Sequence, residues 1–106
     1  MYNVTGELVY KYVLRKGKLF VHEGEISIVG RMQNVYFKDR TPRVRCPKRD
    51  EFGVVQSDGP SLWLGERDDE LAKQLFIEFE EAGLAKLQEQ IRIKSELIKA
   101  LKENSV

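Results

Sequence analysis

Short apolar runs alternate with turn-forming residues through the first 64 residues of the chain. The runs are rich in β-branched and aromatic side chains, which favour strands, and glycines, prolines and charged residues separate them. A hairpin turn is expected at residues 15–18, with further turns at 23–25 and 57–60. The expected strands are residues 8–14, 19–22, 26–29, 32–38, 43–46, 52–55 and 62–64. The pattern predicts a small antiparallel sheet or barrel of five to seven short strands.

Residues 43–46 alternate polar and apolar side chains between Pro42 and Pro47. Because proline has no N–H to donate to a strand ladder, this segment suits an edge strand. Alternation places its two arginines on one face and turns Val44 and Cys46 toward the core. Charged side chains on an edge also discourage aggregation between sheets, which is an interpretation of the arginines that needs no ligand.

After Gly65 the apolar period changes from two residues to about 3.6, which predicts one long C-terminal helix. Acidic residues at its start complement the helix dipole and the free N–H groups there, and they place the start between Gly65 and Asp68. Gly83 is the only interruption. One glycine costs about 1 kcal/mol relative to alanine, so we expect the helix to continue through it, with or without a kink.

The far part of this helix carries apolar residues at alternating three- and four-residue spacing. From Leu84 on, Lys94 is the one position of this seam that is not apolar. An isolated helix of this length is marginal in water, so either the chain's own sheet or another copy must cover the seam. We expect homo-oligomerisation through Leu84, Leu87, Ile91, Ile98 and Leu101.

Together these elements predict an α+β fold in a single domain, residues 1–106, with a β-rich part at 1–64 and a helical, oligomerising part at 65–103. The single cysteine excludes an internal disulfide. The N-terminus lacks the pattern of a signal peptide, and no apolar run reaches the length of a membrane span. We therefore expect a cytoplasmic protein that does not contact membranes.

The formal net charge of +1 conceals two segments of opposite charge. Residues 31–49 carry seven basic residues and one acid, a local balance of +6, whereas residues 66–81 have a balance of −5. Arginine offers a planar fork to phosphate, and aromatic rings offer faces on which a base can stack. The basic segment therefore predicts a site for a nucleotide or a nucleic acid. The candidate ligand residues are Tyr36, Arg40, Arg43, Arg45, Lys48, Arg49 and Trp63.

Two simpler interpretations of these residues stay open. The arginines can be the solvated charges of an edge strand, and Trp63 can be a core residue, because a chain of this size needs its largest side chain for burial.

The sequence offers no pair of groups with a spacing suited to catalysis. His22 is the single histidine and would need a second group to orient it. Cys46 fits a small core filler, although the cations near it could lower its pKa and make it nucleophilic. The sequence contains no phosphate-binding loop, dinucleotide fingerprint, nucleophile elbow or zinc set. We expect no catalytic residue, no metal and no cofactor.

A basic, hairpin-rich first half is followed by SLWLGERDDELAK at residues 61–73, which leads through FIEFEE at 76–81 into the heptad-like helix. In this layout the chain resembles small proteins of phages and prophages of Gram-positive bacteria, and among them the first-described Thoeris anti-defence family. Members of that family are oligomers that sequester cyclic ADP-ribose signals made by host immunity. The resemblance implies a non-enzymatic oligomer with nucleotide pockets at subunit boundaries.

Three functions follow from these patterns. The first is a sponge that binds a phosphorylated nucleotide signal tightly and without turnover. The second is a nucleic-acid binder whose basic segment follows a phosphate backbone, with an affinity that falls steeply with salt. The third is an inhibitor or regulator of a host protein, which uses the helix or the acidic face at residues 66–81 to occupy a groove of its partner.

Overall fold

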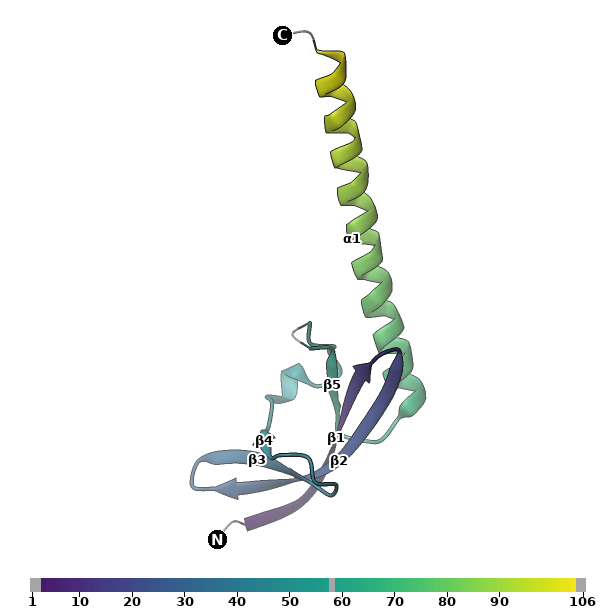
Figure 1. The fold of residues 1–106 in the computed structure, drawn as a ribbon. Coiled ribbons are helices and arrows are strands. Elements are labelled where there is room, and N and C mark those ends of the chain that lie inside the picture. Colours follow the sequence, from purple (N-terminus) through teal and green to yellow (C-terminus); the bar gives the residue numbers. More distant parts are fainter. Residues whose placement is uncertain (1–2, 58, 105–106) are drawn as a thin grey trace. The chain divides into compact units, whose positions relative to one another are not determined.

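The chain folds as an α+β protein in which a curled antiparallel sheet of five strands precedes one long C-terminal helix (Figure 1). This computed structural model describes residues 3–57 and 59–104. The strands lie in the order β4-β3-β2-β1-β5. The elements are β1 (Asn3–Arg15), β2 (Lys18–Val29), β3 (Met32–Phe37), β4 (Val44–Arg45), a 3₁₀ helix (Arg49–Glu51), β5 (Ser61–Leu64) and α1 (Asp69–Glu103). The predicted fold class is confirmed.

The first hairpin turns where the sequence predicts it. Arg15 pairs with Lys18, so only Lys16 and Gly17 lie in the turn. Both have positive φ, 51° and 75° respectively. A two-residue turn with positive φ at both positions matches the right-handed twist of the flanking strands, and glycine adopts it without strain.

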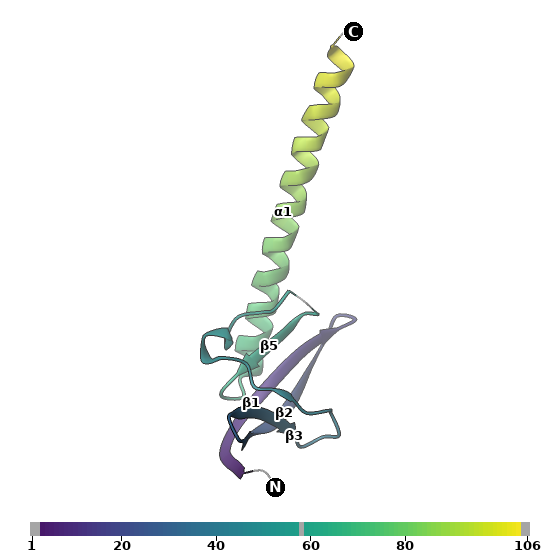
Figure 2. The same cartoon turned by 90° about the vertical axis from the view of Figure 1, so that its left-hand side faces the viewer.

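The turn expected at residues 23–25 does not form, and β2 continues through this segment. Gly24 pairs with Val9 of β1 on one side and with Phe37 of β3 on the other. A Cβ atom on Gly24 would lie 2.4 Å from Cγ1 of Val35 and 3.1 Å from Cδ1 of Phe37. The glycine therefore allows core side chains to pack directly over the strand. Figure 2 shows the curl of the sheet as a whole.

The prediction of a strand at residues 52–55 is also wrong. A short 3₁₀ helix precedes this segment, and Gly53 has a φ of 78°, which interrupts an extended path. The N–H of Gly53 donates to the carbonyl of Trp63 at 2.9 Å. The segment thus lies beside β5 through isolated contacts without becoming part of the ladder.

One hydrophobic cluster lies on the face of the sheet that carries Val9, Val35 and Trp63. Val35, at its centre, is fully buried, and β4 is an edge strand whose Val44 and Cys46 turn toward the core, as alternation predicts. The cluster consists of Val9, Ile26, Val35, Phe37 and Trp63, with Val44, Cys46 and Phe52 packed against it.

Tyr12 joins the sheet to the start of α1. The helix begins at Asp69, and Asp68 caps it, because its Oδ1 accepts a hydrogen bond from the N–H of Leu71 at 3.0 Å. The Tyr12 hydroxyl donates to Oδ1 of Asp69 at 2.7 Å and accepts from the N–H of Asp68 at 3.1 Å. Tyr12 is 1% exposed, and Ala72 in the first turns of the helix is fully buried. These two bonds hold the cap at a fixed place on the sheet.

Helix α1 continues through Gly83 to Glu103, as the sequence predicts. The chain divides into two compact units with the boundary between Leu75 and Phe76. In the second unit the predicted seam residues, Leu84, Leu87, Ile91, Ile98 and Leu101, are 52% to 64% exposed. Across the part of the chain that the structure describes, no helix combines the length and the apolar character that a membrane span requires.

Candidate functional site

An open groove lies where the start of β3 meets the segment that follows β4. Its volume is about 700 Å³, and its lining consists of Arg31, Gln33, Arg45, Cys46, Pro47, Lys48 and Glu51. The N–H of Cys46 donates to the carbonyl of Gln33 at 2.9 Å. This backbone bond aligns the exit of β4 with the start of β3, and it brings Arg31 and Lys48 to one groove although they are far apart in sequence.

The groove is cationic. Three cations, Arg31, Arg45 and Lys48, line it together with a single acid, Glu51. Among residues 3–57 and 59–104, no carboxylate forms an ion pair with any of the three cations. Cations without partners around an open hollow supply donors for phosphate or carboxylate oxygens, and two arginines add the planar geometry that suits them.

Tyr36 and Arg43 form a pair on the other face of the sheet. The guanidinium carbon lies 5.9 Å from the centroid of the Tyr36 ring, and Nη1 donates to the Tyr36 hydroxyl at 2.9 Å. Val35 pairs with Val44 in the ladder and both turn toward the core, so the residues beside them project from the opposite face. The predicted stacking ring and one predicted arginine therefore lie together, and neither of them lines the groove.

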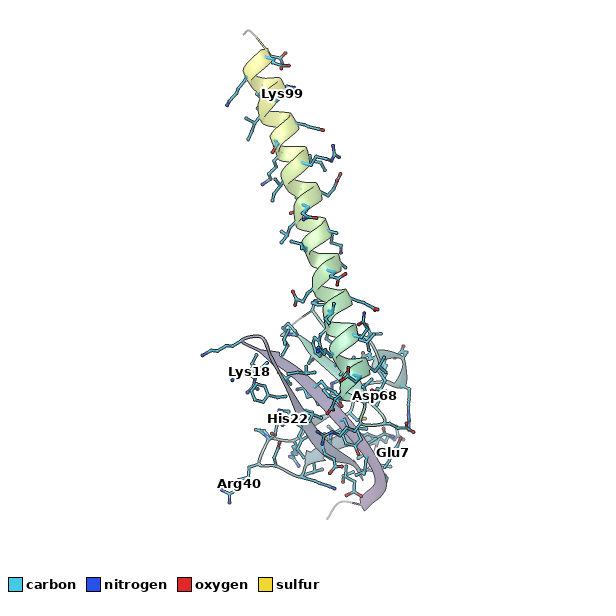
Figure 3. All side chains as sticks on the ribbon, turned by 90° about the vertical axis from the view of Figure 1, so that its right-hand side faces the viewer. Glu7, Lys18, His22, Arg40, Asp68 and Lys99 are labelled. Carbon is cyan, nitrogen blue, oxygen red and sulfur yellow. The ribbon has the colours of Figure 1, made fainter. Side chains whose placement is uncertain are left out.

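Two further predicted cations lie elsewhere. Arg49 forms an ion pair with Glu7 of β1. Arg40 is exposed in the turn after β3, and Figure 3 shows its side chain extending away from the ribbon. Of the seven predicted ligand residues, the structure brings only Arg45 and Lys48 together in the groove.

Sequence reasoning missed Arg31, Gln33 and Glu51 as lining residues. Arg31 belongs to the basic segment, so its charge was visible in the sequence. Its place in the groove depends on the register between β3 and β4, which no local pattern encodes.

Trp63 packs as a core residue. It is 7% exposed, and the ring centroids of Phe37 and Phe52 lie 6.0 Å and 6.5 Å from that of Trp63. The Nζ atom of Lys11 lies 5.6 Å from the same centroid. These contacts occupy the indole, so the alternative interpretation of Trp63 describes it better than a platform for a base.

Cys46 does not have the character of a nucleophile. Burial raises the pKa of its thiol, Glu7 raises it further, and Arg49 opposes them with a smaller effect. The neighbouring cations therefore do not activate this thiol, and the Cys46 side chain packs against the core as a small filler.

His22 has an orienting partner that the sequence did not reveal. Its Nδ1 lies 2.6 Å from Oδ2 of Asp39 and 3.3 Å from Oγ1 of Thr41. The hydrogen bond with His22, followed by those with Thr41, lowers the pKa of Asp39 to about 2. Asp39 and Thr41 both approach the same ring nitrogen, whereas a catalytic triad needs its nucleophile at the other one. The cluster therefore fastens the turn after β3 to β2.

The described residues, 3–57 and 59–104, contain no group of three or more histidine, cysteine, aspartate or glutamate side chains that could hold a metal ion. Comparisons with protein-family models, with curated proteins and with solved structures found no match to this chain.

Proposed function

We propose that this protein is a non-enzymatic, homo-oligomeric binding protein that captures a phosphorylated nucleotide in the groove where the start of β3 meets the segment that follows β4. The observation that carries the proposal is the set of three cations, Arg31, Arg45 and Lys48, around an open hollow with one acid. Among the described residues these cations have no carboxylate partner, so an anionic ligand would supply the missing charge.

The biological role proposed here is that of an anti-defence sponge, encoded by a phage and acting in the host cytoplasm on a nucleotide-type immune signal. The phage setting rests on the resemblance of the sequence layout. The chemistry of the groove is consistent with it, since its lining offers positive charge for phosphates.

Thermal melting of the purified protein with a panel of ligands tests the proposal. The panel contains cyclic nucleotides, ADP-ribose isomers and short single-stranded DNA, and the recovered ligand is weighed by mass spectrometry. A ligand at a hundred times its dissociation constant should stabilise the folded protein by about 2.7 kcal/mol. The expected result is a shift with a phosphorylated nucleotide that is recovered intact.

Two variants locate the site. Arg45→Ala and Lys48→Ala should each abolish the ligand-induced shift, because both side chains line the groove. Arg40→Ala is the matched control: it removes one positive charge from the same basic segment at a side chain that points away from the sheet, so it should keep the shift (Figure 3).

The other outcomes decide between functions. A shift with DNA alone, with an affinity that falls steeply with salt, would replace the nucleotide by a nucleic acid. A changed ligand mass would identify an enzyme. No shift with any member of the panel would refute capture of these nucleotides and favour a host protein as the partner.

A further inference from the structure

The part of α1 beyond residue 76 has two faces of different character. On one face Arg92 donates to Glu89 at 2.5 Å and to Glu96 at 2.8 Å, so its charges are paired within one helix. The opposite face carries exposed apolar side chains, which are Ile77, Leu84, Leu87, Ile91, Ile98 and Leu101.

Two charged residues of opposite sign interrupt the apolar seam. The seam, at alternating spacings of three and four residues, consists of Ile77, Glu80, Leu84, Leu87, Ile91, Lys94, Ile98 and Leu101. Within the described ranges neither Glu80 nor Lys94 forms an ion pair. The rise of the helix separates them by about 21 Å, so they cannot pair within one chain.

The two halves of this segment also differ in charge. Residues 76–89 carry four acids and one base, a balance of −3, whereas residues 90–103 carry four bases and two acids, a balance of +2. Two such helices that overlap along their full length place unlike charges together only when they point in opposite directions.

We propose that this helix pairs antiparallel with the helix of a second copy of the chain, and that Glu80 of each chain binds Lys94 of the partner subunit. One register pairs all the seam positions: Ile77 faces Leu101 of the partner subunit, and Leu87 faces Ile91 of the partner subunit. Lys94 of the partner subunit then lies opposite Leu84, one turn or about 6 Å from Glu80. A lysine side chain spans that distance.

A parallel pair in register loses this match. It places Lys94 against Lys94 of the partner subunit and Glu80 against Glu80 of the partner subunit, inside a seam that is otherwise apolar. Like charges without partners at such positions are strongly unfavourable, so the two polar seam residues select the antiparallel direction.

This inference rests on the homo-oligomer part of the proposed function and not on the ligand. The two can fail separately. Absence of nucleotide binding leaves the pairing of the helices unchanged, whereas a helix that pairs in another way leaves the cationic groove unchanged.

Disulfide exchange measures the direction of pairing. Full-length chains with Cys46→Ser and either Ile77→Cys or Leu101→Cys, distinguished by a tag, are mixed in a glutathione redox buffer. Antiparallel pairing predicts that the mixed disulfide predominates over both homodisulfides together. Glu89→Cys, on the self-paired face of the helix, is the control and should remain reduced. Predominance of the homodisulfides would overturn the proposal.

A charge exchange then tests the ion pair by sedimentation of the full chain. Glu80→Lys and Lys94→Glu should each weaken self-association about tenfold, and the double variant should restore most of it. Lys99→Glu changes the net charge equally at a side chain outside the seam, shown in Figure 3, and should have little effect. A wild-type chain that stays monomeric, or a double variant weaker than either single one, would contradict the pairing.

Discussion

The sheet buries its apolar side chains, whereas the far part of α1 exposes them. In the sheet, Val9 and Val35 are at most 1% exposed, whereas Leu87 and Ile91 on the helix are 58% and 64% exposed. A core completed within one chain gives stability that does not depend on protein concentration. A seam covered by a second copy gives stability that rises with protein concentration. The sheet therefore buries its apolar side chains within one chain, whereas the seam of the helix needs a second chain to be buried.

The largest expected effect concerns the core. Trp63→Ala should lower the free energy of unfolding by about 3 to 5 kcal/mol, because it removes a buried ring that packs against Phe37 and Phe52. Urea denaturation followed by circular dichroism measures the loss, which should be the same at all protein concentrations. Trp63→Phe keeps an aromatic filler and should cost much less. An equally small effect of both substitutions would show that this core is not what stabilises the sheet.

A smaller effect, and one that depends on concentration, is expected on the helix. The double variant Leu87→Ala with Ile91→Ala should weaken self-association by about 2 kcal/mol, roughly 30-fold, since it truncates the centre of the seam. Dilution series followed by the helix signal in circular dichroism give the midpoint. Lys99→Ala serves as a control outside the seam. If neither the wild type nor the variant loses helix signal on dilution, the seam is not covered by a second copy.

The sequence predicts those parts of the fold that depend on near neighbours. The turn at Lys16 and Gly17 follows from residue types within the turn itself. Gly24 misled the prediction because its role depends on Val35 and Phe37, which reach it from another strand. A glycine that serves close packing and a glycine that serves a turn look alike until the pairing of the strands is known.

The same limit applies to the candidate site. Alternation correctly predicted that Val44 and Cys46 face the core. It could not predict that Arg45 lines the groove while Arg43 pairs with Tyr36. Likewise, residue types alone do not show which chain segment lies beside His22. Local periodicity gives the face of each side chain, and only the register decides which faces meet.

The contact that holds the start of α1 to the sheet gives the smallest expected effect. Tyr12→Phe removes the hydrogen bonds to Asp68 and Asp69 and should lower the free energy of unfolding by about 1 to 2 kcal/mol. Urea denaturation at several protein concentrations should show the same loss throughout, because the contact lies within one chain. Tyr10→Phe is the control, since its hydroxyl bonds to Glu23 in a less buried place and should contribute less.

Alkaline titration tests the same contact without a mutation. Burial, then the hydrogen bond to Asp69, raises the pKa of Tyr12 to about 12. Because the folded pKa lies above the ordinary value of about 10, the stability that Tyr12 contributes is fully present below pH 10 and is lost as the pH rises toward 12. Absorbance at the phenolate band should therefore show a transition near pH 12 that is missing in Tyr12→Phe. If that variant keeps the late transition, Tyr12 is not the buried donor to Asp69, and the helix cap is held in place by other contacts.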